Sequence, residues 1–417
     1  MTQQDVSSWK SKFAAMGPGI LMASAAVGGS HIIASTQSGA IYGWQLAIII
    51  ILANLFKYPF FRFGTQYTLA NNKTLIEGYK EKGGFYLWVF FLLNVFATVI
   101  NTAGVGIVTA AILSFMLPTS WGLTISQLSI IVISSTWGFL LLGKYRLLDK
   151  VSKLIMIALT ISTVAAVIIA AFKTKVVAPD FVEASPWNLG ALAFIVALMG
   201  WMPAPIEISA INSMWVVAKK RFTKISYRDG LFDFNVGYIG TAILALVFLA
   251  LGALVQYGTG EQVEQAGVKY IAQLIKMYAF AIGEWSAMLI AFIAFMCMLG
   301  TTITVIDGYS RANAEAFRIL WNKTESAQVQ LNIWMTIAAA SGIIIITMFM
   351  SDVAKMLRFA MICSFVSTPI FAWLNLSLVL KGEHRVKGGL LWLSIIGLIY
   401  LTGFALLFIV HQFGWLS

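Results

Sequence analysis

The chain has 417 residues, of which 59% are hydrophobic and 11% charged. An average soluble domain is about 45–50% apolar and about 25% charged. The mean hydropathy of +0.85 over the whole chain leaves no room for a large water-soluble part. This composition excludes a soluble enzyme, a disordered scaffold and a receptor with a single membrane anchor. It predicts one polytopic membrane bundle of the all-α class.

Eleven apolar stretches are each long enough to cross a bilayer as a helix, because a span needs about 20 apolar residues. Segments of about ten residues with alternating hydrophobicity, which are typical of a membrane barrel, do not occur in the sequence. The predicted spans lie near 17–42, 44–70, 85–117, 123–142, 151–172, 188–217, 231–256, 280–306, 329–350, 353–380 and 389–411.

Lysines and arginines are unevenly divided between the two sides of this bundle. If the N-terminus lies in the cytoplasm, the inner segments hold 20 of the 28 basic residues and the outer segments hold four. Cytoplasmic segments of membrane proteins carry such an excess. We therefore expect a multi-pass protein of the cytoplasmic (inner) membrane with its N-terminus inside and its C-terminus outside. Anionic lipid is the expected partner of the basic segments, and nucleic acid is not expected.

Two of the stretches contain residues that interrupt a helix. Residues 27–31 of the first stretch read VGGSH, and each glycine weakens a helix by about 1 kcal/mol relative to alanine. Residues 200–205 of the sixth read GWMPAP, where each proline removes a backbone donor. Interrupted spans at matching places in two halves indicate a secondary transporter with inverted repeats and a substrate site at the bilayer midplane.

These breaks divide the chain into repeats. We expect 1–16 to be a cytoplasmic N-terminal segment and 17–172 to be a first inverted repeat of five spans. Residues 188–380 would form the second repeat, and 389–411 an additional eleventh span.

Three short stretches carry a resemblance to a known family. The sequence MGPGILMA at 16–23, the run LANL at 52–55 and the pair Met202-Pro203 resemble the Nramp metal-ion transporters, and the resemblance extends diffusely over nearly all spans. It implies a LeuT-type 5+5 inverted repeat in which helices 1 and 6 are broken. In typical members, an Asp-Pro-Gly-Asn motif on the first span and Met-Pro-His on the sixth bind a divalent transition metal, with proton coupling.

The sequence departs from the family's pattern at the metal site. Residues 27–30 read VGGS where the resemblance places Asp-Pro-Gly-Asn, and Ala204 stands at the histidine position. The third span has no acidic residue for a proton route, since no Asp or Glu occurs between Glu81 and Asp149. Hard and borderline divalent cations prefer carboxylate or imidazole ligands. The resemblance therefore implies the fold, while the usual metal site is not retained.

Residues at the two breaks are the candidate substrate site. Met202 and Glu207 are the candidate metal ligands, because Glu207 could supply the negative charge that the first span lacks. His31 could bind a cation or carry a proton, or it could be hydrogen-bonded to a neighbouring helix. The complete set is Val27, Gly28, Gly29, Ser30, His31, Met202, Ala204 and Glu207.

Three ionisable residues are candidates for coupling or gating, because charged groups within a membrane are costly. Lys57 lies in the middle of the second span, where it could be a fixed counter-charge to Glu207. Asp233 opens the seventh span and Asp307 lies at the inner end of the eighth, so both could belong to an inner vestibule or gate.

The sequence contains few other residues or motifs that indicate a chemical function. Cys297 and Cys363 lie in separate apolar stretches and are expected to be core thiols. No phosphate-binding loop or metalloprotease motif occurs, so neither an enzyme nor a resident cofactor is expected.

Three hypotheses for the function follow from the sequence. The leading one is a secondary transporter of a divalent cation, with protons as the possible coupling ion. A transporter of a small organic solute, whose carboxylate would be held by the backbone amides of 28–30, is the alternative. The third is a non-transporting sensor.

Overall fold

The computed structural model describes residues 9–143, 145–174, 177–264, 267–323, 326–349, 352–382 and 384–415, with the backbone alone for Lys10 and 145–153. Lys144 and Lys175, two of the charges counted for the orientation, lie outside the described residues. Within these ranges the regular structure is helical throughout and contains no strand, so the all-α prediction is confirmed.

The helices follow the predicted order of spans. Their bounds are α1 (Trp9–Ala15), α2 (Pro18–Ala26), η1 (Ser30–Ser35), α3 (Thr36–Tyr42), α4 (Ala47–Asn71), α5 (Leu75–Lys82), α6 (Gly84–Met116), η2 (Thr119–Trp121), α7 (Ile125–Leu141), α8 (Tyr145–Phe172), α9 (Leu189–Gly200), α10 (Ile208–Lys220), α11 (Tyr227–Val255), α12 (Val268–Ile282), η3 (Glu284–Ser286), α13 (Ala287–Leu320), α14 (Ala327–Ile344), η4 (Ile345–Phe349), α15 (Val353–Leu378) and α16 (Gly388–Gln412).

Both predicted breaks occur in the structure. Among the described residues, eight helices are long and apolar enough to cross a membrane, and the pair 18–26 and 30–42, bent by 51°, would form a ninth span. The shorter apolar helices α7 and α9 remain. Because α9 continues into α10 after the non-helical segment 201–207, these two form one interrupted span. The eleven predicted spans are thereby accounted for.

Helices α5 and α12 lie between spans and were not predicted from the sequence. Helix α5 begins with a capping box in which Thr74 and Glu77 satisfy each other's backbone N–H groups. Helix α12 buries one face only, including Tyr270, Leu274 and Tyr278. Because these helices are short and amphipathic, they leave no long apolar stretch in the sequence. Helix α13 also runs on to Leu320, well beyond the predicted end at residue 306.

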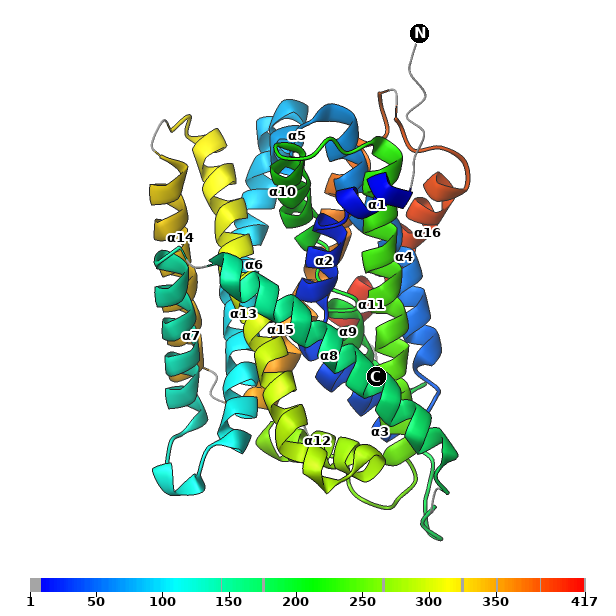
Figure 1. Cartoon of the computed structure of the whole chain (residues 1–417). Coiled ribbons are helices and arrows are strands. Elements are labelled where there is room, and N and C mark those ends of the chain that lie inside the picture. Colours follow the sequence, from blue (N-terminus) through cyan, green and yellow to red (C-terminus); the bar gives the residue numbers. More distant parts are fainter. Residues whose placement is uncertain are drawn as a thin grey trace.

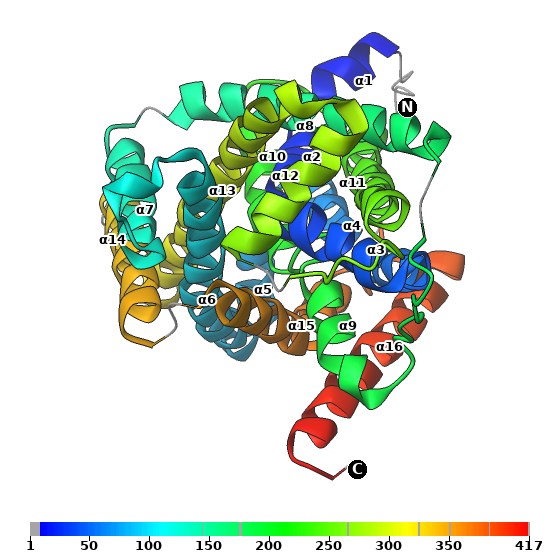
Figure 2. The same cartoon turned by 90° about the horizontal axis from the view of Figure 1, so that it is seen from below.

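Segments that were predicted to lie on opposite sides of the membrane are found at opposite ends of the bundle. Figure 1 shows α1 and α5 at the upper end and α12 at the lower end. Helices α6, α7, α13 and α14 form one side of the bundle, whereas α4, α11 and α16 form the other (Figure 1). Figure 2, seen from below, shows the helices arranged around α2, which packs against α10, α11 and α13.

Both halves of the first span pack closely against α11. A Cβ atom on Gly39 would lie 1.9 Å from the carbonyl oxygen of Leu249, and one on Gly252 would lie 2.0 Å from that of Thr36. Likewise, a Cβ atom on Gly19 would lie 2.2 Å from the carbonyl oxygen of Asp233. Only glycine permits such approaches between backbones. The α11 helix therefore fixes the first span on either side of its break.

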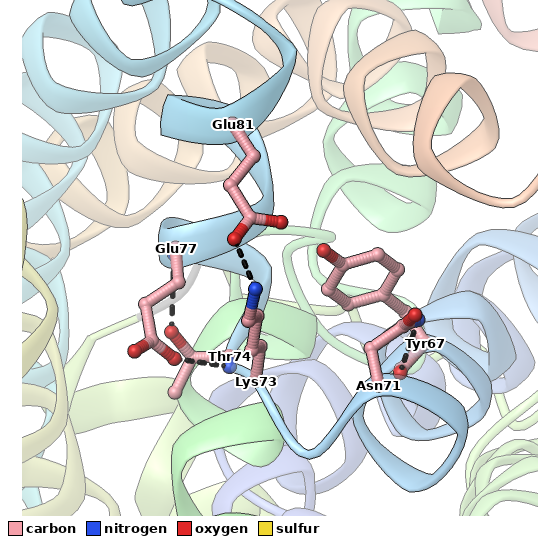
Figure 3. A network of polar contacts seen from close by, with 6 residues as sticks. All are labelled: Tyr67, Asn71, Lys73, Thr74, Glu77 and Glu81. Atoms are coloured by element: carbon pink, nitrogen blue, oxygen red, sulfur yellow. Dashed lines mark hydrogen bonds and ion pairs between the residues drawn. The ribbon is translucent and has the colours of Figure 1, made fainter.

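The turn between α4 and α5 is built from polar contacts, which Figure 3 shows. Helix α4 ends at Asn71, and the following residue, Asn72, has a left-handed φ of 55°, as is common at helix C-termini. Lys73 forms an ion pair with Glu81, and this hydrogen bond raises the pKa of the lysine. The ion pair joins the turn to the last residues of α5.

Candidate functional site

The first break is a short non-helical segment followed by a π-helical turn. Helix α2 ends at Ala26, and Val27 has a ψ of 93°, outside the helical region. The carbonyl of Gly28 then accepts hydrogen bonds from the N–H groups of His31 and Ile32, at 3.1 and 2.9 Å. A Cβ atom on Gly28 would lie 2.9 Å from Oγ1 of Thr301. Glycine here lets the break lie directly against α13.

The carbonyl of Val27 points out of the helix toward α13. It accepts from Sγ of Cys297 at 3.3 Å and from Oγ1 of Thr301 at 3.5 Å. The Thr301 hydroxyl has a single proton, and it also lies 3.3 Å from the carbonyl oxygen of Cys297, so Cys297 is the main partner of the Val27 carbonyl. In this conformation the Val27 carbonyl is engaged by α13. Cys297 is buried, as expected of a core thiol.

The second break is held by a lysine from α4. The ammonium of Lys57 donates to three backbone carbonyls, those of Met199 at 2.6 Å, Gly200 at 2.8 Å and Ala204 at 3.3 Å. The side chain is fully buried, and its three donors are all used. Two of these carbonyls belong to the C-terminal end of α9, the negative end of its dipole. The hydrogen bonds of Lys57 thus go to the broken helix and not to Glu207.

Glu207 lies at the start of α10 with one carboxylate oxygen bound. Its Oε1 accepts from the hydroxyl of Tyr309 at 3.0 Å, whereas Oε2 is buried and has no hydrogen-bond partner in the described part of the chain. The Tyr309 hydroxyl accepts in turn from Nδ2 of Asn101 at 3.1 Å. Oδ1 of Asn101 accepts from the indole N–H of Trp201 at 3.0 Å. One chain of hydrogen bonds therefore joins both sides of the sixth-span break to α6 and α13.

A cavity of about 30 Å³ lies between the two breaks. Since one water needs roughly 10–15 Å³ of such space, it has room for one or two water molecules. Most of its wall is apolar, and the few polar groups come from both breaks and from α6 and α13. The residues that line it include Gly28, Gly29, Ser30, Asn101, Trp201, Pro203, Ala204, Pro205, Thr301 and Tyr309.

Half of the predicted substrate-site residues line this cavity. Gly28, Gly29, Ser30 and Ala204 do so, and Glu207 reaches its wall through Tyr309. The remaining three, which are Val27, His31 and Met202, are buried beside the breaks and are not among its lining residues.

His31 is directed toward α11. Its Nδ1 is 2.8 Å from Oγ of Ser30, and its Nε2 is 3.0 Å from the carbonyl oxygen of Thr241. Both ring nitrogens are therefore occupied within the protein. This geometry supports the interpretation of a histidine bonded to a neighbouring helix, since a free nitrogen for a cation is not left.

The two aspartates proposed for gating have local partners. The carboxylate of Asp233 accepts from the N–H groups of Gly17 at 3.0 Å and Gly19 at 2.6 Å, and so caps the start of α2. Asp307 forms a bidentate ion pair with Arg311, one turn along α13, at 2.7 and 2.8 Å. Both groups stabilise helices that border the cavity, and neither lines it.

Neutral polar side chains also join α6 to α13, through contacts that were not predicted from the sequence. Nδ2 of Asn94 donates to Asn313 at 2.7 Å, and Thr109 is 2.9 Å from Thr302. On α6, positions 94, 98, 101 and 109 carry Asn or Thr at helical spacing, and this pattern could have revealed a polar face. In the described residues, no three His, Cys, Asp or Glu side chains gather closely enough to hold a metal ion.

A family model described as natural resistance-associated macrophage protein-like matches residues 19–411. The chain belongs to the Nramp family. It is 71% identical to an uncharacterised protein of Pasteurella multocida over the whole of this chain and 97% of that protein. It is 22% identical over 277 residues to the divalent metal cation transporter MntH of Listeria welshimeri. That alignment spans 63% of this chain and 60% of MntH.

Solved structures show the Nramp fold over nearly the whole length. A variant of the manganese transporter of Eremococcus coleocola has a TM-score of 0.72 at 15% identity, covering 99% of this chain and 89% of that one. MhsT in complex with L-phenylalanine has a TM-score of 0.58 at 12% identity, covering 98% of this chain and 99% of that one. The expected LeuT-type architecture is therefore confirmed, together with the family resemblance.

Proposed function

We propose that the chain is a secondary-active transporter that carries a divalent metal cation through the cavity between its two breaks by alternating access. Family membership, the relatives named MntH and the fold shared with a manganese transporter support this proposal. The observation that carries it is the buried Glu207 carboxylate, whose Oε2 has no partner in the described residues. A buried, unsatisfied carboxylate is costly unless a cation or a proton meets it.

The proposed ligand set centres on Glu207. In this conformation two of the expected ligands are engaged elsewhere, the Val27 carbonyl by α13 and the Ala204 carbonyl by Lys57. Oxygen donors from Ser30 and Thr301 line the cavity and would complete the shell together with water. Met202 stays a proposed soft ligand, which would have to turn into the cavity. The oxygen-rich set favours hard cations such as Mg²⁺ and Mn²⁺.

The size of the cavity restricts how the ion crosses. Each water needs roughly 10–15 Å³ of such space, so a cavity of about 30 Å³ is too small for an ion with its full hydration shell. The ion must lose most of its waters, or the breaks must separate as the transporter changes state. The organic-solute alternative is less well supported, because pockets for such ligands are usually about 300–1,000 Å³.

The repeat boundaries, the orientation in the membrane and the proton route are also part of this proposal. The repeats would be 17–172 and 188–380, with 389–411 as the additional span. The basic end of the bundle would face the cytoplasm and anionic lipid of the inner membrane. Since the described part of α6 presents Asn and Thr to α13, protons would not follow an acidic route along the third span.

Uptake into proteoliposomes tests the proposal. Purified protein is reconstituted, and Mn²⁺ and Mg²⁺ uptake are compared side by side under an imposed gradient, with protein-free liposomes as the control. Saturable uptake of at least one ion above the control supports divalent-cation transport. If neither ion enters faster than in empty liposomes, over a range of pH and membrane potential, the proposal is wrong.

A further inference from the structure

A buried lysine of α4 is hydrogen-bonded to the broken sixth span, which is an unusual polar contact within a membrane bundle. Lys57 comes from the second span, and its ammonium is bonded to carbonyls on both sides of the bend at residues 201–203. The last four carbonyls of a helix are left without intrahelical partners. The Met199 carbonyl also accepts from the N–H of Met202 at 3.3 Å, whereas Lys57 makes the only hydrogen bond described for the carbonyls of Gly200 and Ala204. They therefore require a donor or a cation from elsewhere in the molecule.

The arrangement has the chemistry of a cation site. In transporters with interrupted helices, unwound carbonyls and the C-terminal ends of half-helices bind the coupling cation. Here a positive charge is held by three carbonyl oxygens between 2.6 and 3.3 Å, and it is covalently attached to α4. No water is needed to complete its hydrogen bonds, because an ammonium has only three N–H groups.

We propose that Lys57 is a tethered cation, which permanently occupies the cation position at the end of α9. The sixth span can then keep its break without binding a dissolved monovalent cation at that place. This cation position is distinct from the proposed substrate site, because it lies on the other side of Ala204 from the cavity between the breaks. It also holds whichever solute the cavity between the breaks carries.

Removing the side chain should convert this position into an ordinary cation site. Lys57→Ala deletes Cγ, Cδ, Cε and Nζ, which leaves a void of the shape of n-propylammonium. It also removes the only donor described for the carbonyls of Gly200 and Ala204, and one of the donors to that of Met199. A small cation that enters this void restores the lost hydrogen bonds. Lys57→Met also removes the charge, but it fills most of the void, so a propylammonium ion cannot enter.

The test measures the melting temperature of the purified protein in n-propylammonium, sodium, potassium and N-methylglucamine chloride at equal ionic strength. We expect Lys57→Ala to melt roughly 5–10 °C below the wild type in N-methylglucamine. Propylammonium or sodium should recover at least half of this loss, in a concentration-dependent manner. Lys57→Met should lose a similar amount without recovery by propylammonium. Lys73→Ala, at the surface turn after α4, is the matched lysine control and should show no dependence on the cation.

Two results would overturn the proposal if the variants can be purified, and a third would do so if Lys57→Ala cannot be. One is a Lys57→Ala protein whose melting temperature is the same in all four salts. Another is wild-type protein that gains as much from propylammonium as the variant does. If Lys57→Ala cannot be purified in N-methylglucamine, the yield of monodisperse protein becomes the measurement. Recovery with propylammonium or sodium then supports a tethered cation, and failure in every salt contradicts it. Because none of these measurements uses transport, they stand apart from the uptake test.

Discussion

The hydroxyl of Tyr309 donates a hydrogen bond to Oε1 of Glu207 at 3.0 Å, which joins the eighth span to the second half of the broken sixth span. The bond fixes one carboxylate oxygen and leaves the other without a partner among the described residues. An ion bound at Glu207 would thus be linked to α13, and the two helices would respond to it together.

Tyr309→Phe removes this donor and also the acceptor of Asn101. We expect a loss of about 1.5–3 kcal/mol in the free energy of unfolding, the usual worth of a hydrogen bond to a charged group, together with a several-fold fall in ion uptake. Melting temperature and proteoliposome uptake measure the two effects. Tyr278→Phe is the control, because its hydroxyl is buried 2.7 Å from Thr163, outside the cavity. It should lower stability and spare uptake; equal uptake losses in both variants would contradict the role of Tyr309.

Gly28→Ala should close the cavity against α13. Its Cβ would lie 2.9 Å from Oγ1 of Thr301, so either the break or the threonine must move. We expect uptake to fall at least tenfold, and we expect Thr301→Ala to relieve the contact when both changes are combined. A double-mutant cycle of uptake and melting temperature measures this coupling. Purely additive losses would show that the two residues do not meet in the working protein.

Gly252→Ala should prevent the first span from packing on α11. The new Cβ would lie 2.0 Å from the carbonyl oxygen of Thr36, a backbone atom that cannot turn away. We expect little or no monodisperse protein in size-exclusion chromatography. Gly240→Ala, in the same helix, is the matched control, because nothing lies within 4 Å of its Cβ. It should be neutral or stabilising by about 1 kcal/mol. Similar yields from both variants would show that the close packing is not required.

Thr74→Ala should weaken the α4–α5 turn without affecting the site (Figure 3). The change removes the side-chain oxygen that accepts from the N–H of Glu77, at 3.2 Å. Loss of such a cap costs about 0.5–2 kcal/mol. The melting temperature should fall slightly, while the concentration of ion at half-maximal uptake stays unchanged. A shift in that concentration would mean that α5 is coupled to the cavity.

The sequence revealed the fold through residues whose effect is local. The paired glycines at 28–29 and the paired prolines at 203 and 205 coincide with the breaks, whereas the single prolines at 59 and 369 lie inside α4 and α15. Apolar length predicts the spans. The short helices α5 and α12 could not be predicted in the same way, since each is amphipathic and packs only in the folded bundle.

The partners of the buried charges depend on tertiary structure. Lys57 was proposed as a possible counter-charge to Glu207. The two groups do interact electrostatically, but the hydrogen bonds of the ammonium go to carbonyls at the end of α9. His31 stands beside a glycine break, but α11 supplies the carbonyl of Thr241 that binds it. Asp233 was proposed as a vestibule or gate residue, and it caps the start of α2. Sequence spacing cannot show which backbone groups a neighbouring helix presents.

The central claim is that Glu207 is the acidic residue of the substrate site. Mn²⁺ and Mg²⁺ uptake should therefore be compared in proteoliposomes that contain the wild type, Glu207→Gln or Glu284→Gln. Glu284 is an exposed residue near the start of α13 and provides the same chemical change away from the cavity. The account predicts that Glu207→Gln loses at least nine-tenths of the saturable uptake, whereas Glu284→Gln keeps the wild-type rate. Wild-type uptake by a folded Glu207→Gln protein would contradict it.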